Sequence, residues 1–321
     1  MGMLVEGKWQ DVWYDTTKTG GAFKREQSQF RQWIKADGST PFAPEMDRYH
    51  LYVSLACPWA SRTLIMRKLK QLENIIGLSI VDPLMREHGW VFSKNTDCIP
   101  DTVNHCEYAY QLYTLANSHY TGRVTVPILW DKHTKTIVNN ESSEIMRIFN
   151  QEFNHLTHNT LDMYPPELRP EIDKINDDIY HTINNGVYKC GFATEQPVYE
   201  QAYDELFAAL DHYEQHLSQH RYLVGKQITE ADWRLFVTLI RFDAVYVGHF
   251  KCNKKRIADY PNLHNYIREL YQYPGVADTV NFEHIKQHYY RSHITINPTQ
   301  IVPKGPELTF NAAHDRARLT L

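Results

Sequence analysis

The chain has 321 residues, which exceeds the roughly 250–300 residues at which a single hydrophobic core stops growing. We therefore expect two units, each with its own core. Hydrophobic residues make up 42% and charged residues 22%, which excludes disordered, collagen-like and coiled-coil chains. The 34 Lys and Arg against 38 Asp and Glu give a net charge of −4, and no large basic stripe stands out, which argues against nucleic-acid binding.

The sequence also predicts a compartment. No apolar stretch approaches the ~20 residues that cross a bilayer, and the first residues lack the long apolar segment of a signal peptide. The five cysteines form no C-x-x-C pair, and a chain of this size does not need disulfides. We therefore predict a cytoplasmic protein without a membrane partner. Its cysteines are expected to be reduced, so the role of each thiol depends on its own position in the fold.

Residues 48–153 show the pattern of a small mixed sheet with helices. The expected elements are a strand, a helix, a strand, the two strands of a hairpin and a helix, at 49–54, 59–72, 75–81, 124–130, 136–138 and 144–153. The first three form a β-α-β unit, which implies parallel pairing. A polar insertion at 82–123 separates that unit from the hairpin.

From 171 to 290 apolar residues recur at helical spacing, which predicts an all-α unit. Thr229 and Asp232 have the spacing of a capping box ahead of one of its helices. The predicted organisation is an extension, a sheet-containing domain, a polar and Pro-rich linker, a helical domain and an irregular tail, at 1–47, 48–153, 154–170, 171–290 and 291–321.

Cys57 lies at the turn between the first strand and the first helix, and Pro58 suits the first helical position. Its sulfur would face unpaired backbone N–H groups and the positive end of the helix dipole, which favour a thiolate. The alternative, a small buried apolar residue, fits this position less well. No second cysteine follows in a C-x-x-C pair, so a mixed disulfide here needs an external thiol, for which glutathione is the abundant candidate.

Two further positions suit a peptide-like ligand. Val126 precedes Pro127 at a strand start, where a cis bond would expose its backbone groups to an extended peptide; an ordinary trans proline is the alternative. Glu141 and Ser142 precede a helix, where the hydroxyl and backbone N–H groups can hold a carboxylate and Glu141 can pair with an ammonium. A simple helix cap is the alternative.

Metal and nucleotide cofactors have little support. His212, His216 and His220 are spaced by four residues, and His284 and His288 repeat that spacing, which could place metal ligands on one helix face. Neither group has a Cys or HExxH partner, and solvated helix faces often carry His, so we expect no metal. No Gly-x-Gly-x-x-Gly or P-loop motif is present, so we expect no nucleotide.

Five segments carry a recognisable combination of motifs, namely LACPWASR, VPILWD, VNNESSEI, GVYKCGFA and TEAD, at 55–62, 126–131, 138–145, 186–193 and 229–232. Together they resemble the glutathionyl-hydroquinone reductases, also called Xi-class glutathione transferases, over nearly the whole chain. Cys-Pro-Trp-Ala alone would also suit the related omega class. The insertion with Gly89 and Trp90, the 186–193 segment and the Tyr289-Tyr290 pair favour the Xi class.

This resemblance implies an α/β plus all-α architecture: a thioredoxin-like domain followed by a helical glutathione-transferase domain, in a homodimer. Glutathione would bind to the first domain as co-substrate, and a quinol-type aromatic substrate would lie between the two. Cys57 would be the nucleophile. The residues implied to hold glutathione are Trp90, Arg123, Val126, Glu141 and Ser142. The residues implied to face the quinol ring are Tyr188 with Tyr289 or Tyr290.

The expected function is the glutathione-dependent reduction of glutathionyl-hydroquinones to hydroquinones, with formation of oxidised glutathione through a Cys57–glutathione mixed disulfide. An alternative is an omega-like thiol transferase or dehydroascorbate reductase, which relative rates on the two substrate types would distinguish. A non-enzymatic alternative is a glutathione-binding scaffold. The presence of Cys57 argues against a scaffold, which has no need for a nucleophile.

Overall fold

A computed structural model describes residues 2–319, which form two compact units. The first unit comprises the described residues up to Trp13, Glu26–Leu161 and Thr279–His293. The second comprises Tyr14–Arg25, Asp162–Asp278 and the described residues from Ile294 onward. No helix between residues 2 and 319 has the length and apolarity that a bilayer span requires.

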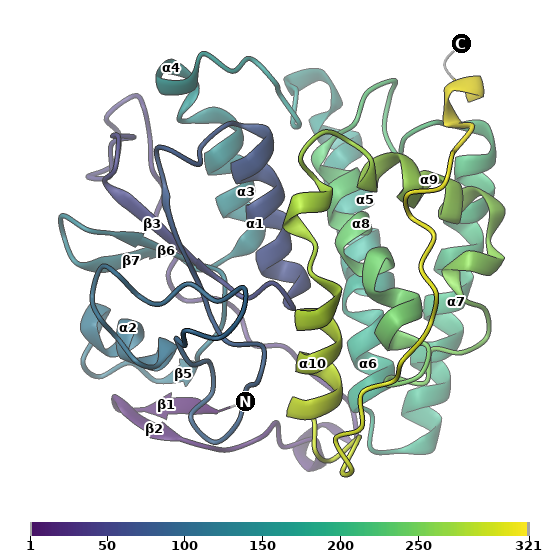
Figure 1. Ribbon diagram of the computed structural model, residues 1–321, viewed down its shortest axis with the longest axis horizontal. Helices are drawn as coiled ribbons and strands as arrows, with labels where there is room; N and C mark the ends of the chain where they lie inside the picture. Colours follow the sequence, from purple (N-terminus) through teal and green to yellow (C-terminus); the bar gives the residue numbers. More distant parts are fainter. Residues whose placement is uncertain (1, 320–321) are drawn as a thin grey trace. The chain divides into compact units, whose positions relative to one another are not determined.

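The first unit is built on a four-stranded sheet of order β4-β3-β6-β7, of which β3, β6 and β7 are labelled in Figure 1. Its strands are β3 (Tyr49–Val53), β4 (Gly77–Ile80), β6 (Ile128–Asp131) and β7 (Thr136–Asn139). β3 pairs parallel with β4 and antiparallel with β6, and β6 pairs antiparallel with β7. The predicted β-α-β unit and hairpin are confirmed. The hairpin begins at Ile128 rather than 124, just after Pro127, which has no N–H to donate to a strand pair.

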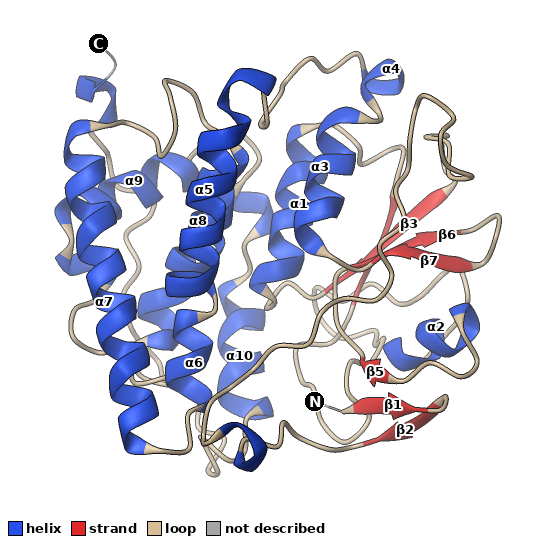
Figure 2. Cartoon of the chain, turned by 180° about the vertical axis from the view of Figure 1, so that it is seen from behind, coloured by secondary structure: helices blue, strands red, loops and turns tan. Residues whose placement is uncertain are grey.

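Helices α1 (Pro58–Leu69) and α3 (Ser142–Gln151) lie side by side in this unit (Figures 1 and 2). α1 is the crossover that the parallel pair requires. α3 begins two residues before the predicted start, because the Glu141 carboxylate accepts a hydrogen bond from the Ser143 N–H at 3.2 Å and caps the helix there. Within the polar insertion, α2 (Ala109–Ala116) packs against β7.

The N-terminal residues form strands that the sequence did not predict. β1 (Met3–Val5), β2 (Lys8–Gln10) and β5 (Gly122–Arg123) make an antiparallel sheet of order β2-β1-β5. Trp9 in β2 donates its indole N–H to a carbonyl oxygen of the insertion, that of Glu87, at 2.8 Å. The sequence analysis placed this segment in an N-terminal extension and predicted no strands there. Strands of two or three residues are too short to show the alternation by which strands are recognised.

The second unit consists of helices (Figure 2). Its α-helices are α5 (Arg169–Ile179), α6 (Gly186–Phe192), α7 (Gln196–Gln219), α8 (Glu230–Arg241) and α9 (Pro261–Tyr271), and no strand occurs in Asp162–Asp278. π-helical turns at Tyr180–Asn184 and Phe242–Tyr246 adjoin α6 and α8. The capping box is confirmed, since the Thr229 N–H donates to the Asp232 carboxylate at 2.7 Å. The predicted linker contains the short helix α4 (Asn154–Thr157).

Helix α10 (Phe282–Ser292) belongs to the first unit, whereas the sequence boundaries grouped it with the helical domain. His284 Nε2 lies 3.0 Å from the Thr96 carbonyl oxygen, and His288 Nδ1 lies 2.8 Å from that of Pro83. A carbonyl only accepts, so both imidazoles donate and fasten α10 to the 82–123 insertion. Helical periodicity identifies such a helix but not the unit against which it packs.

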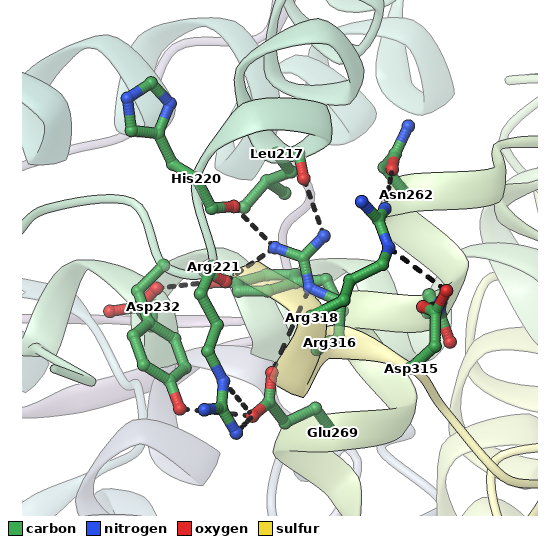
Figure 3. Close-up of polar contacts among 12 residues, drawn as sticks. Leu217, His220, Arg221, Asp232, Asn262, Glu269, Asp315, Arg316 and Arg318 are labelled. Atoms are coloured by element: carbon green, nitrogen blue, oxygen red, sulfur yellow. Dashed lines mark hydrogen bonds and ion pairs between the residues drawn. The ribbon is translucent and has the colours of Figure 1, made fainter. Parts of the chain in front are cut away.

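The C-terminal tail is anchored within the second unit by Arg316, which is fully buried (Figure 3). Its guanidinium donates to the carbonyl oxygens of Leu217, His220 and Arg221 at 2.6 Å each. These acceptors lie at the C-terminal end of α7, where backbone carbonyls lack intrahelical partners and the helix dipole is negative. Glu269 of α9 lies 3.9 Å away and supplies a carboxylate. One cation therefore joins the tail to two helices.

We predict that Arg316→Leu lowers the free energy of unfolding by about 3 kcal/mol, because it leaves the three carbonyl oxygens without their buried charged donor. Arg318→Leu is the matched control. Arg318 is half-exposed and pairs with Asp315 at 3.1 Å, so its loss should cost less than about 1 kcal/mol. Urea unfolding followed by circular dichroism measures both variants. Equal losses would contradict an anchoring role for Arg316.

Candidate functional site

The strand register brings the segments that carry five of the nine predicted site residues to one edge of the four-stranded sheet. Tyr52 pairs with Ile128, so the end of β3 lies beside the start of β6. Leu129 pairs with Asn139, so the end of β7 lies there as well. β4 runs parallel to β3, and its end reaches the same edge. The residues on segments that leave or enter the sheet at this edge are Cys57, Trp90, Val126, Glu141 and Ser142.

Cys57 is the N-cap residue of α1, with extended backbone angles φ −76° and ψ 120°, and Pro58 takes the first helical position. Its side chain is half-buried, and its Sγ lies 3.6 Å from the carbonyl oxygen of Val126. Val126 is joined to Pro127 by a cis peptide bond, the rarer of the two alternatives weighed from the sequence. The N–H groups and dipole at the start of α1 favour a thiolate at this sulfur.

Three of the other four cysteines lie where their thiols stay protonated. Burial raises the pKa of Cys98, and burial together with the negative charge of Asp101 raises the pKa of Cys106 to about 12. Cys252 is fully buried, and burial, followed by a hydrogen bond with Cys190, raises its pKa well above the usual range. The pKa values of these three thiols are set by burial, whereas Cys57 is half-buried and lies at the N-terminus of a helix.

The start of α3 offers donors for an anionic group. Glu141 caps the helix, and its carboxylate also accepts from the hydroxyl groups of Ser143 at 3.0 Å and Ser28 at 3.2 Å. Ser142 follows as the first helical residue, and its hydroxyl lies 3.4 Å from the guanidinium of Arg62. The Arg62 side chain is buried in α1. The helix cap predicted as the alternative is therefore present. The Ser142 hydroxyl, the backbone N–H groups at the start of α3 and the buried Arg62 guanidinium lie beside it.

Arg123 connects the insertion to the N-terminal segment. It lies in β5, where it pairs with Met3 of β1. Its guanidinium donates to the carbonyl oxygens of Val12 at 2.5 Å and Trp13 at 3.0 Å, and its Nε lies 4.0 Å from the Glu26 carboxylate. In this structure Arg123 holds the N-terminal segment in place, three residues before Val126.

Trp90 lies on the insertion and is supported by α10. Its ring stacks on that of His288, with centroids 4.9 Å apart and planes 21° from parallel. Tyr289 and Tyr290 follow on the same helix and are both buried. The ring of Tyr289 packs edge-on against those of His288 and His293. α10 thus carries both the residue beneath Trp90 and the tyrosine pair, a connection that the sequence analysis missed.

Tyr188 lies on α6 in the second unit. Its ring packs against four aromatic rings, those of Phe23, Phe192, Tyr246 and Phe250. The guanidinium of Arg25 lies 5.2 Å from the centre of the Tyr188 ring, a cation–π distance. Arg25 and Phe23 belong to an N-terminal stretch without helical or strand periodicity, so the sequence offered no signal that they meet Tyr188.

The histidine pairs form no metal centre that can be recognised. His284 and His288 donate to main-chain carbonyls, and His216 and His220 stack on each other with centroids 4.4 Å apart. Within residues 2–319 no group of three or more His, Cys, Asp or Glu side chains is arranged to hold a metal ion.

Comparison with known proteins covers both units. Residues 56–152 match the N-terminal domain of the glutathione S-transferases, and residues 196–269 match their C-terminal domain. The chain is 56% identical over 323 residues to the glutathionyl-hydroquinone reductase YqjG of Escherichia coli, with 98% of each chain covered.

Two solved structures are also similar. The glutathione-bound structure of the Escherichia coli protein has a TM-score of 0.90 at 53% identity, covering 98% of this chain and 99% of that chain. A Xi-class glutathione transferase from Natrialba magadii has a TM-score of 0.93 at 48% identity, covering 99% and 97%. The chain therefore belongs to the glutathione transferases, and within them to the Xi class of glutathionyl-hydroquinone reductases.

Proposed function

We propose that this protein reduces glutathionyl-hydroquinones to hydroquinones and forms oxidised glutathione. The observation that carries the proposal is Cys57 at the N-terminus of α1, half-buried and 3.6 Å from the backbone of Val126. The name of the Escherichia coli relative, a glutathionyl-hydroquinone reductase, supports the same reaction. The decisive experiment is a mass-spectrometric assay of thiol-dependent hydroquinone release from a glutathione adduct.

The reaction proceeds in two steps, an attack on the thioether sulfur followed by a thiol–disulfide exchange. The Cys57 thiolate attacks the sulfur of the aromatic thioether, which forms a Cys57–glutathione disulfide and breaks the bond between sulfur and the ring. The ring carbon keeps the electron pair of that bond and takes up a proton, which yields the hydroquinone. A second glutathione thiolate then attacks the mixed disulfide, releases oxidised glutathione and regenerates the Cys57 thiolate. Overall, the sulfur of the adduct's glutathione and the sulfur of the second glutathione each give up one electron to form the disulfide, and the ring carbon receives both.

Glutathione is bound along the sheet edge that carries Cys57. The backbone N–H and C=O of Val126 pair with the extended peptide, as a strand edge does. The N-terminus of α3 holds a carboxylate through the Ser142 hydroxyl and its backbone N–H groups, supported by the buried Arg62 guanidinium 3.4 Å from that hydroxyl. Glu141 pairs with the ammonium group. Trp90 and Arg123 complete the set of residues assigned to glutathione.

The aromatic part of the substrate is bound by tyrosines. Tyr188 and either Tyr289 or Tyr290 donate phenolic O–H groups to the quinol oxygens, while their rings supply apolar contact. The aromatic cluster around Tyr188 and the Arg25 guanidinium 5.2 Å from its ring support a fixed orientation of that phenol. The physiological protein is proposed to be a cytoplasmic homodimer, as its class suggests, and light scattering of the purified protein tests the oligomeric state.

The alternative, an omega-like thiol transferase or dehydroascorbate reductase, is less favoured. The Escherichia coli relative aligns over 98% of this chain and carries the reductase name. The two functions are separated by the ratio of kcat/KM on a glutathionyl-hydroquinone and on dehydroascorbate. A higher value on dehydroascorbate would favour the alternative.

We predict that Cys57 is alkylated before the other cysteines. At about pH 6 the thiols of Cys98, Cys106 and Cys252 are protonated, because raised pKa values reduce the thiolate fraction, and only the thiolate reacts. Brief treatment of the reduced protein with iodoacetamide, followed by peptide mass spectrometry, gives the order of labelling. First labelling at any other cysteine would contradict the thiolate assignment.

We predict that Cys57→Ser abolishes hydroquinone release but leaves glutathione binding within about threefold of wild type, because serine stays protonated and cannot form the mixed disulfide, while the α1 N-terminus remains. Without the Cys57 thiolate, the backbone N–H groups at the start of α1 can stabilise the thiolate of bound glutathione. We therefore also expect weak conjugation of glutathione to an electrophilic aromatic. Release is compared with a control that lacks enzyme. Substantial residual release would show that glutathione itself is the nucleophile.

We predict that Tyr188→Phe lowers kcat on a glutathionyl-hydroquinone by about tenfold or more and changes the Kd of glutathione by less than about twofold, because the lost hydroxyl is assigned to the quinol oxygen and not to glutathione. Tyr203→Phe is the control, since Tyr203 lies on α7 outside the proposed site. Steady-state kinetics and calorimetric titration provide the two values. A parallel loss in both would place Tyr188 elsewhere.

A further inference from the structure

We propose that His288 is a positioning residue that holds the Trp90 ring in the glutathione site, an inference that rests on the role proposed above for Trp90. The two rings stack with centroids 4.9 Å apart and planes 21° from parallel. His288 is 6% exposed and Trp90 5% exposed, so the stack is excluded from water. Near-parallel aromatic rings at this distance attract each other beyond the area that they bury.

The stretch Pro83–Trp90 forms a loop that is closed at its base. The Asp82 N–H donates to the Val91 carbonyl at 2.8 Å, and at the tip the Gly89 N–H donates to the Arg86 carbonyl at 2.9 Å. Gly89 has φ +68°, a left-handed conformation that side chains disfavour. The backbone of this loop is therefore defined, but these bonds do not fix the direction of the Trp90 ring.

His288 contacts both ends of this loop. Its ring stacks on Trp90, the last residue, while its Nδ1 donates to the carbonyl oxygen of Pro83, the first residue, at 2.8 Å. The hydrogen bond and the burial of both rings together hold the imidazole with its flat face toward the indole. Ser292, one turn further along α10, places its Oγ 3.5 Å from the same carbonyl. The Pro83 carbonyl therefore keeps a donor if His288 is replaced.

His284 is a matched control on the same helix. It lies one turn before His288, is also buried, and its Nε2 donates to the Thr96 carbonyl oxygen at 3.0 Å. Both histidines fasten α10 to the insertion, but the partner of His284 lies outside the Pro83–Trp90 loop. A purely structural role would make the two positions equivalent, whereas a positioning role makes only His288 matter for glutathione.

The test compares His288→Asn, His288→Phe, His284→Asn and Trp90→Phe in the reduced, full-length protein. Calorimetric titration with glutathione gives Kd. Incorporation of 5-fluorotryptophan gives a 19F NMR signal for Trp90, which Trp90→Phe identifies by its disappearance. His288→Asn keeps a donor but loses the ring, and should raise Kd about three- to tenfold and move the Trp90 signal. His288→Phe loses the hydrogen bond but keeps a ring confined by the same buried position, and should stay within about twofold of wild type.

The outcomes separate this inference from the proposed function. His284→Asn should leave both Kd and the Trp90 signal near their wild-type values. Equal increases of Kd in His284→Asn and His288→Asn would overturn the positioning role. An unchanged Kd in His288→Asn would also overturn it, if Trp90→Phe weakens binding.

An unchanged Kd in Trp90→Phe would overturn the assignment of Trp90 to glutathione, and this inference with it. Hydroquinone release by the wild type would still test the reductase function. If His288→Asn fails to fold, His288→Phe decides the question. A Kd of His288→Phe as high as that of Trp90→Phe refutes the proposal, whereas a Kd within about twofold of wild type supports it.

Discussion

The antiparallel pairing of β3 with β6 is the constraint on which the candidate site depends. It brings the chain after β3 and the chain before β6 to one edge, where the Cys57 sulfur lies 3.6 Å from the Val126 carbonyl oxygen. At the opposite end of the β3–β6 pair, the Arg48 guanidinium donates two hydrogen bonds, of 2.9 and 3.0 Å, to the Asp131 carboxylate. A slip of one residue would turn every side chain of β3 to the wrong face and would break this buried pair. The register, and with it the meeting of Cys57 and Val126, is therefore strongly determined.

The same topology concentrates positive potential at that edge. α1 follows β3 and α3 follows β7, so the N-termini of both helices lie where the ends of these two strands meet, and the two helices pack side by side. The buried Arg62 guanidinium adds a full charge next to Ser142 and lies 4.5 Å over the Trp59 ring. A thiolate at the first helix and a carboxylate at the second are favoured by one arrangement of dipoles. The elements that form the fold thus also create the electrostatic environment that the proposed chemistry needs.

Elements with local signals could be predicted from the sequence. The aromatic and β-branched run of β3, the Cys57-Pro58 turn and the Thr229–Asp232 capping box each carry their information within a few residues. The pairing of β1 with β5 joins residues more than 110 positions apart, and the contacts of Phe23 and Arg25 with Tyr188 join residues more than 160 apart. Periodicity shows which face of an element is buried but not what covers it, so these contacts were not predictable.

The histidines of α10 show the same limit in the candidate site. A spacing of four residues places His284 and His288 on one helix face, whether they bind a metal, face water or donate to carbonyls. The structure selects the last of these, and it adds a stacked tryptophan to only one of them. Successive residues of a helix point about 100° apart, so the residue that supports Trp90 and the adjacent tyrosine pair project in different directions from one rigid rod. On the proposed assignment, Trp90 contacts the peptide end of the adduct and the tyrosine pair contacts its quinol end. Because α10 carries the tyrosine pair and supports Trp90 through His288, it keeps the distance between these two contacts constant, as the two ends of one molecule require.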